Sequence, residues 1–306
     1  MKELYGSGNY TYEEVNGWGE LPAGLIANDC PDIYVDGRDR ILAMCRTGNK
    51  IVEMTTDGAV TDVWTKDEFV EIHSVIVDDS TGDYYVTDEF AHTVWKLSED
   101  RKLLMIIGTP GVPSTPETEP GKYLNRPTAA AIDDEKNIYV ADGYGDCQIH
   151  KYRADGTWVW SIGEEGSDEQ AFFRPHGISI YDGKLYVSDR DNDRIKVYTL
   201  DGELINIMPV SVHRPSQLDA RNDVIYLCEM DKNRNKPDAV PSRISILKTD
   251  GEVLTRLEGY DGYSRGEAIS GVSHGIAVDS EGNLYIADTG RKPESYVGIH
   301  KYRLVK

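Results

Sequence analysis

The architecture follows from one short segment, Gly82-Asp83-Tyr84-Tyr85-Val86-Thr87-Asp88. It holds aromatic and β-branched residues between a turn and an acidic residue, which is typical of a β-strand. The same pattern returns as Asn137-Ile138-Tyr139-Val140-Ala141-Asp142, Lys184-Leu185-Tyr186-Val187-Ser188-Asp189 and Asn283-Leu284-Tyr285-Ile286-Ala287-Asp288. A strand pattern that recurs in this way predicts an all-β protein built from repeats.

Two weaker copies, Arg40-Ile41-Leu42-Ala43-Met44-Cys45 and Val224-Ile225-Tyr226-Leu227-Cys228-Glu229, bring the number of copies to six. Each copy follows another short apolar strand, and the period is about 40 to 58 residues. Roughly four strands per repeat at this period predict a six-bladed β-propeller, because one small sheet cannot bury both faces without neighbours. The expected blades cover residues 31–64, 72–108, 126–163, 174–208, 214–259 and 272–306.

The last blade has one strand fewer than the others. The outer strands of blades two and three end in Ile107-Gly108 and Ile162-Gly163, and the stretch 10–21, with Trp18-Gly19-Glu20, is similar to these endings. We therefore expect the N-terminal stretch to pair with the last blade as its outer strand. Such a pairing closes the ring and removes open sheet edges, so that residues 1–306 form a single domain.

The composition narrows the classes of partner. With 33 Lys and Arg against 53 Asp and Glu, the 306-residue chain carries a formal net charge of −20, which disfavours nucleic acid. No apolar run approaches the roughly 18 residues that cross a bilayer, and the start of the sequence lacks the apolar core of a secretory signal. We expect a cytoplasmic protein without membrane contact, a monomer or a weak homo-oligomer. The four cysteines lack metal-binding spacing, which favours free buried thiols.

Histidine recurs at one position of the repeat. The residue that opens the innermost strand is His73 in blade two, His176 in blade four and His274 in blade six. Alternate blades of a six-bladed ring lie about 120° apart, so these imidazoles converge on the channel axis. A lone channel histidine is more typical of a bond to backbone or water, but three neutral imidazoles with an open fourth position predict catalytic zinc, or another divalent transition metal. The blades between them carry Asp32, Thr128 and Ser216 at this position.

A second set of polar residues comes directly after the recurring strand described above, following the acidic residue with which that strand ends. Arg46 in blade one and Arg190 in blade four occupy equivalent positions, and Tyr144 lies one residue further along in blade three. Equivalent blades would place these side chains at the same end of the channel as the histidines. Together with the histidines, Arg46, Arg190 and Tyr144 form one candidate site. The alternative for Arg190 is an ion pair with Asp189 or Asp191.

Several segments resemble one known family in order and in blade position. They are Ile72-His73-Ser74-Val75, Tyr85-Val86-Thr87-Asp88, Ala141-Asp142-Gly143-Tyr144, Trp160-Ser161-Ile162-Gly163-Glu164-Glu165, Arg174-Pro175-His176-Gly177, Ser188-Asp189-Arg190-Asp191-Asn192 and Ser273-His274-Gly275. The repeats resemble NHL-type propeller repeats over nearly the whole chain, and these segments resemble the peptidyl-α-hydroxyglycine α-amidating lyase family.

The resemblance implies a zinc enzyme that splits a carbinolamine, an N-acylated 2-hydroxyglycine, into a primary amide and glyoxylate. It makes His73, His176 and His274 the zinc ligands. Tyr144 would act as the base, and Arg46 and Arg190 would hold the carboxylate of a small anionic substrate, which a guanidinium binds through two hydrogen bonds. The family places an acidic ligand of a structural calcium directly after the third histidine, where this chain has a glycine, so the resemblance does not extend to that calcium.

Three functions remain open on the sequence. The first is a zinc-dependent lyase that releases glyoxylate and an amide. The second is a metal-dependent hydrolase or lactonase, in which the metal activates water. The third is a non-catalytic NHL propeller that presents its rim to a protein partner and binds no stoichiometric metal.

Overall fold

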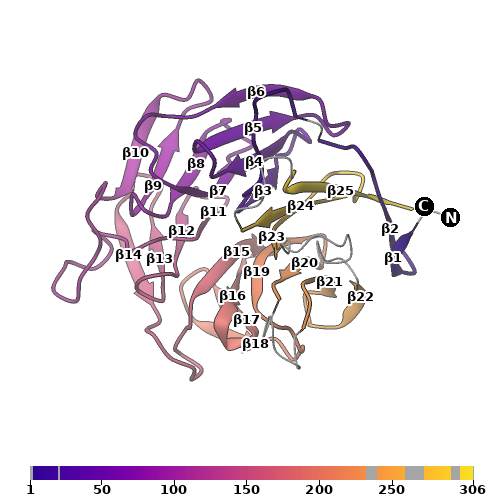
Figure 1. Ribbon diagram of the computed structural model, residues 1–306. Helices are drawn as coiled ribbons and strands as arrows, with labels where there is room; N and C mark the ends of the chain where they lie inside the picture. Colours follow the sequence, from indigo (N-terminus) through magenta and orange to yellow (C-terminus); the bar gives the residue numbers. More distant parts are fainter. Residues whose placement is uncertain (1–2, 20, 232–239, 259–271, 291–296, 306) are drawn as a thin grey trace. The chain divides into compact units, whose positions relative to one another are not determined.

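The computed structural model describes residues 3–19, 21–231, 240–258, 272–290 and 297–305. Within these ranges the regular structure is β-strand, apart from one short 3₁₀ helix, η1 (Arg190–Asn192). The strands form six antiparallel sheets, which are the blades of a six-bladed β-propeller, as expected (Figure 1). The chain divides into two compact units, Asp67–Met208 on one side and Met1–Lys66 with Pro209–Lys306 on the other. No helix among the described residues is long and apolar enough to span a bilayer.

Blades two, three and four form the unit Asp67–Met208, and each has four strands that neighbour one another in chain order. Blade two consists of β7 (Ile72–Val77), β8 (Tyr84–Asp88), β9 (Thr93–Leu97) and β10 (Leu103–Gly108). Blade three consists of β11 (Ala129–Ile132), β12 (Ile138–Asp142), β13 (Gln148–Tyr152) and β14 (Trp158–Ile162). Blade four consists of β15 (Pro175–Tyr181), β16 (Lys184–Asp189), β17 (Arg194–Thr199) and β18 (Leu204–Ile207). The inner strand β11 contacts both β7 and β15, so blade three lies between its two neighbours.

Blades five, six and one form the other unit. Blade one consists of β3 (Ile33–Val35), β4 (Ile41–Cys45), β5 (Lys50–Met54) and β6 (Val60–Trp64). Blade five consists of β19 (Pro215–Arg221), β20 (Val224–Glu229), β21 (Arg243–Lys248) and β22 (Val253–Leu257). Blade six consists of β23 (Val272–Val278), β24 (Leu284–Thr289) and β25 (Ile299–Leu304), joined by β2 (Tyr10–Glu14) and β1 (Leu4–Ser7).

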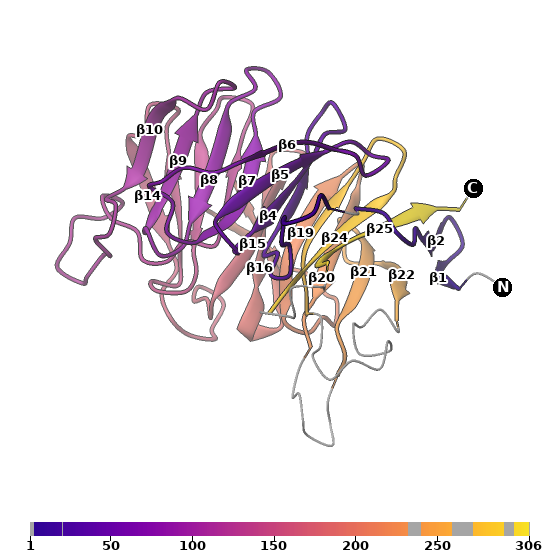
Figure 2. The ribbon, with the colours of Figure 1, turned by 45° about the horizontal axis from the view of Figure 1, so that its top comes forward.

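The N-terminal strand completes the last blade, as expected from the sequence. β2 pairs antiparallel with β25, with Tyr12 opposite Leu304 and Glu14 opposite Tyr302 (Figure 2). The strand ends at Glu14, earlier than the predicted stretch 10–21, because the chain turns at Gly17 and Gly19, whose φ angles are 77° and 74°. Glu20 of that stretch lies outside the described residues. β1 adds a fifth strand that the sequence pattern did not predict.

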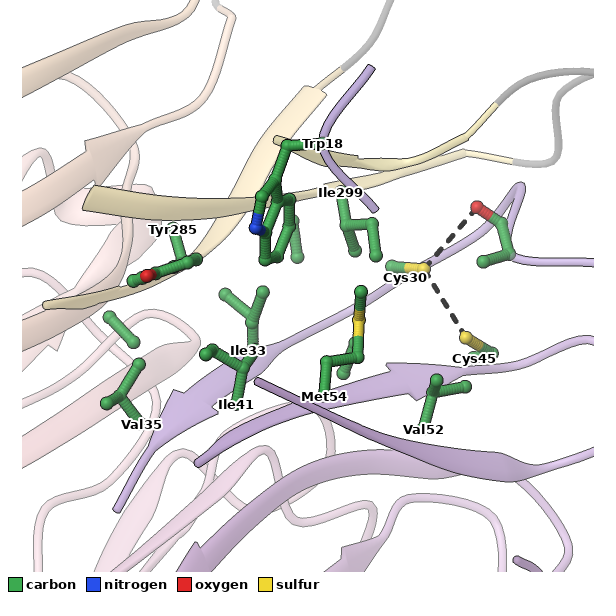
Figure 3. Close-up of a cluster of buried hydrophobic side chains, with 14 residues drawn as sticks. Trp18, Cys30, Ile33, Val35, Ile41, Cys45, Val52, Met54, Tyr285 and Ile299 are labelled. Atoms are coloured by element: carbon green, nitrogen blue, oxygen red, sulfur yellow. Dashed lines mark hydrogen bonds between the residues drawn. The ribbon is translucent and has the colours of Figure 1, made fainter. Parts of the chain in front are cut away.

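Trp18 shows why the N-terminal stretch belongs to this blade. Its ring packs against that of Tyr285 (Figure 3), with the ring centres 5.1 Å apart. Its Nε1 donates a hydrogen bond to the carbonyl of Thr56. The same cluster buries Cys30 and Cys45, whose sulfur atoms are 3.7 Å apart. All four cysteines are buried free thiols, as predicted.

His300 links the N-terminal strand to the blade. Its Nε2 lies 3.3 Å from an Asp288 carboxylate oxygen, and its Nδ1 lies 3.7 Å from one of Glu14. Burial by itself would lower the pKa of His300, but the two carboxylates outweigh burial and raise it above its ordinary value. The protonated form therefore stabilises the contact between β2 and its neighbours.

We expect the contribution of His300 to be complete below about pH 6.5 and to be lost as the pH rises through the raised folded-state pKa. Urea unfolding of the wild type and of His300→Gln over a pH series measures it. The stability difference between the two proteins should shrink as the pH rises above about 6.5. A difference that stays constant over this range contradicts the prediction.

Candidate active site

Each of the three repeat histidines lies at an irregularity of its inner strand. The pairing register shifts between Ile72 and Ser74 around His73, and between Ser273 and Gly275 around His274. His176 lies in the corresponding shift of blade four, between Pro175 and Ile178. A bulge of this kind redirects a side chain away from the regular alternation of the strand. All three histidines are buried, with 2% of their surface exposed.

The neighbouring blade orients two of these imidazoles. Nδ1 of His73 is 2.6 Å from the carbonyl oxygen of Thr128, and Nδ1 of His274 is 2.6 Å from that of Pro31. A carbonyl only accepts, so Nδ1 carries the proton, and the neutral ring keeps its lone pair on Nε2. In metal-binding histidines, a hydrogen bond donated by the ring nitrogen that does not bind the metal fixes the tautomer and the orientation of the ring. The donor set therefore fits a divalent metal such as zinc.

Hydroxyl residues support the histidines from the blades between them. Thr128 Oγ1 donates to the carbonyl of His176 at 2.9 Å, and Ser216 Oγ donates to the carbonyl of His274 at 2.8 Å. The sequence indicated that histidine alternates with other residues at this position, but it assigned no role to the hydroxyls. Their role is to tie the backbone of the following histidine in place.

Tyr144 lies beside two of the histidines in the unit Asp67–Met208. Its hydroxyl oxygen is 3.4 Å from Nε2 of His73 and 3.1 Å from Nε2 of His176. Tyr144 lies between Gly143 and Gly145, where neighbouring backbone leaves no room for a side chain. A Cβ on Gly143 would lie 1.7 Å from the carbonyl oxygen of Pro175. Glycine at positions 143 and 145 lets the chain after β12 pass close to this backbone, which places Tyr144 beside the histidines.

Arg190 lies in η1 and contacts the same hydroxyl. Its Nη1 donates to Tyr144 Oη at 3.2 Å, and its Nε lies 3.2 Å from Asp191. Burial by itself would lower the pKa of Arg190, but Tyr144 and Asp191 outweigh burial and raise it. The ion pair with Asp191 that the sequence offered as an alternative is present, whereas Asp189 pairs with Arg194.

Arg46 occupies the corresponding position in blade one, in the unit that also holds His274. Its Nη1 donates to Thr289 Oγ1 at 3.1 Å and lies 3.7 Å from Asp29 Oδ1. Its side chain keeps 20% of its surface exposed, compared with 4% for Arg190. Arg46 is therefore the more accessible of the two predicted arginines.

The glycine after the third histidine has a packing reason. A Cβ on Gly275 would lie 2.6 Å from the Cα of Asp32 on the neighbouring blade. Burial raises the pKa of the Asp32 carboxyl well above its usual range. An acidic side chain at position 275 would require these strands to separate.

Sequence reasoning missed Arg126 and Glu89 at this site. The Arg126 guanidinium lies 5.1 Å from the centre of the Tyr144 ring, and its Nε donates to Glu89 Oε1 at 3.1 Å. The sequence carries a signal for this arginine, because an Arg-Pro pair precedes the inner strands of blades three, four and five. The pair does not reveal which side chain the arginine contacts.

Comparisons with known proteins point to two groups of relatives. Over 221 residues the chain is 29% identical to a probable peptidyl-alpha-hydroxyglycine alpha-amidating lyase of Caenorhabditis elegans, covering 68% of the chain and 59% of that protein. It is 31% identical over 230 residues to peptidyl-glycine alpha-amidating monooxygenase B of Xenopus laevis, covering 69% of the chain and 24% of that protein. It is also 28% identical over 221 residues to NHL repeat-containing protein 3 of Homo sapiens, covering 70% and 61%. The matches thus span less than two thirds of each relative, and no family model matches the chain.

Solved structures share the fold. A gluconolactonase from Xanthomonas campestris superposes with a TM-score of 0.70 at 12% identity, covering 100% of this chain and 96% of that one. Virginiamycin B lyase from Staphylococcus aureus superposes with a TM-score of 0.60 at 16% identity, covering 97% and 88%. At these identities the likeness shows the propeller fold alone.

Proposed function

We propose that this protein is a metal-dependent lyase that cleaves a small carbinolamine of the N-acyl-2-hydroxyglycine type into an amide and glyoxylate. The observation that carries the proposal is the Tyr144 hydroxyl, which lies next to Nε2 of two buried histidines and accepts a hydrogen bond from Arg190. A hydroxyl in this position is suited to proton transfer next to a bound ligand. Similarity to an amidating lyase favours the same chemistry.

The proposed metal ligands are His73, His176 and His274. Each of the three is buried and offers one ring nitrogen as a metal ligand. The Nδ1 bonds of His73 and His274 to backbone carbonyls support the proposal, because they leave Nε2 as the donor. A zinc ion bound there would supply Lewis-acid polarisation of a substrate oxygen.

Arg46 and Arg190 are proposed to have different roles, one in substrate binding and the other at the Tyr144 oxygen. Arg46 is proposed to bind the substrate carboxylate through its partly exposed guanidinium, whose Nη1 is oriented by Thr289 and Asp29. Arg190 holds the Tyr144 oxygen and stabilises negative charge on it after the phenol has lost its proton. Two guanidiniums favour a small anionic substrate, although the net charge of the whole chain is −20.

The reaction balances without a further reactant. Tyr144 Oη, deprotonated, takes the proton of the substrate hydroxyl, and the oxygen forms a carbonyl as the C–N bond breaks. The electron pair of that bond goes to the amide nitrogen, which takes the proton that Tyr144 Oη has accepted, so that the deprotonated phenol is restored. The products are glyoxylate, with its carboxylate still bound by Arg46, and a neutral amide.

The test is an assay of zinc-loaded protein with an N-acyl-2-hydroxyglycine, in which glyoxylate and amide are quantified separately. We expect equal amounts of both, formed much faster than without protein, and little reaction after the metal has been removed. Glyoxylate formation no faster than the uncatalysed reaction refutes the proposal. Opening of a lactone in a parallel assay would instead support a hydrolase, and absence of both activities together with absence of metal binding would support an interaction propeller.

A further inference from the structure

Three blades carry an arginine at the same position of the repeat, and in one of them the arginine contacts a different partner. Arg126, Arg174 and Arg214 each precede a proline at or just before the start of an inner strand, and each has a left-handed backbone, with φ of 63°, 58° and 39°. Arg174 Nη1 lies 3.1 Å from an Asp191 carboxylate oxygen, and Arg214 Nη1 donates to the carbonyl of Asp231 at 3.0 Å. In blades four and five, therefore, the arginine binds the residue two positions after the acidic end of the second strand.

Blade three departs from this arrangement. The residue two positions after Asp142 is Tyr144, not an aspartate. The Arg126 guanidinium lies over the Tyr144 ring, and its counter-ion is Glu89, which comes from blade two. The arginine–aspartate contact of the repeat has thus become an arginine–tyrosine stack at the one blade that supplies the proposed base.

Arg126 is held from several sides. Its backbone N–H donates to His92 Nδ1 at 3.1 Å, and its carbonyl accepts from the Tyr144 N–H at 3.3 Å. The Glu89 side chain is 3% exposed and accepts from both Nε and Nη2. A left-handed arginine costs free energy and persists only where its surroundings fix it. These contacts, with the ion pair to Glu89, place the Arg126 guanidinium between the rings of Phe90 and Tyr144.

The two arginines at Tyr144 share its ring but differ at its hydroxyl. Both guanidiniums lie 5.1 Å from the centre of the ring. Arg190 also donates to the hydroxyl, whereas Arg126 accepts from the Tyr144 N–H through its carbonyl, pairs with Glu89 and lies 4.8 Å from the centre of the Phe90 ring. A guanidinium over a tyrosine face is attracted to the ring quadrupole, which resists displacement of the ring. Without Arg126 the ring would keep its contacts with Arg190 but lose the cation that is paired with Glu89 of blade two.

We propose that Arg126, with Glu89 as its counter-ion, is a positioning residue that holds the Tyr144 ring so that the hydroxyl stays beside His73 and His176. The proposal rests on the proposed lyase function and names a residue that this function requires. Arg126 acts through Tyr144, so its loss should slow the chemical step and leave substrate binding nearly unchanged.

The kinetic test compares Arg126→Gln with Arg174→Gln, which removes the equivalent arginine of blade four. We expect Arg126→Gln to lower kcat on the order of ten-fold, with KM changed less than about two-fold, because a small displacement of a reacting group is costly. Arg126→Lys should recover part of the loss by restoring a cation over the ring. Arg174→Gln should leave both constants within about two-fold of wild type. A raised KM at unchanged kcat, or equal losses in both arginine-to-glutamine variants, overturns the proposal.

A second measurement does not depend on activity. A single 3-fluorotyrosine at position 144 reports the surroundings of the ring through its ¹⁹F resonance. We expect the resonance to shift or broaden in Arg126→Gln and in Arg126→Gly, and to stay unchanged in Arg174→Gln. Arg126→Gly suits the left-handed backbone, so it removes the side chain without straining the turn.

The two measurements separate the two proposals. An unchanged resonance in both Arg126 variants, with cooperative thermal unfolding retained, overturns the positioning role even if the protein is a lyase. A resonance that responds in a protein that releases no glyoxylate supports the positioning of Tyr144 and refutes the lyase.

Discussion

Replacing Tyr144 by phenylalanine is expected to lower kcat by about 10²- to 10⁴-fold, the usual contribution of a general base. The substitution removes only the hydroxyl that lies beside His73 and His176 and accepts from Arg190. The phenyl ring remains under Arg126, so the packing of blade three is preserved. Steady-state assay of glyoxylate release gives the loss in kcat and the change in KM separately.

Tyr139→Phe is the matched control for this prediction. Tyr139 lies in β12 of the same blade, but its hydroxyl donates to Asp133 Oδ2 at 3.0 Å, away from the histidines. The control should change thermal stability without changing kcat. Tyr144→Phe should also bind as much zinc as the wild type, so that its loss of activity is not a loss of metal. Full activity in Tyr144→Phe refutes the assignment of the base.

The sequence predicted the blades well because strand alternation is a local property. The expected second blade, 72–108, agrees with the observed span from β7 to β10, and the tyrosines of the strong copies, such as Tyr85 and Tyr285, are buried in the core. A period-two pattern that ends at a turn needs no knowledge of the rest of the chain. The missing strand of blade six was predictable for the same reason, by counting strands per repeat.

The contacts between blades could not be predicted in this way. Alignment of the repeats places Arg126 and Arg174 at the same position, yet Arg174 pairs within its own blade and Arg126 pairs with Glu89 of the preceding one. The difference arises because Tyr144 replaces the aspartate that the arginine would otherwise bind. Sequence position specifies which residue is present, whereas packing of the neighbouring blade specifies its partner.

The hydrogen bonds that orient the histidines could not be predicted from the sequence either. The imidazole of His73 is fixed by a backbone carbonyl of blade three, and backbone carbonyls leave no mark in a sequence. The equivalence of the three histidines was visible, but the tautomer was not. Residue identity therefore predicted the elements of the site, and only the structure supplied the contacts that make Nε2 the donor.

The second large effect concerns the metal. His73→Ala is expected to weaken zinc binding by more than about 100-fold, because loss of a ligand costs at least as much as loss of the group that orients one. Zinc per chain after gel filtration should fall from about one to near zero, and glyoxylate release should fall with it. Elemental analysis measures the first, and the lyase assay measures the second.

His92→Ala is the matched control, since His92 belongs to the same blade and lies outside the three repeat positions. It should keep zinc stoichiometry, although its contact with the backbone N–H of Arg126 is lost. Unfolding provides a readout without substrate, because a metal that binds only the folded state stabilises it by about 2.7 kcal/mol at 100 times its Kd. We expect zinc to raise the thermal midpoint of the wild type and of His92→Ala, and to leave that of His73→Ala unchanged. A zinc-dependent shift that survives in His73→Ala would place the metal elsewhere, and the proposed roles of His176 and His274 would then fail with that of His73.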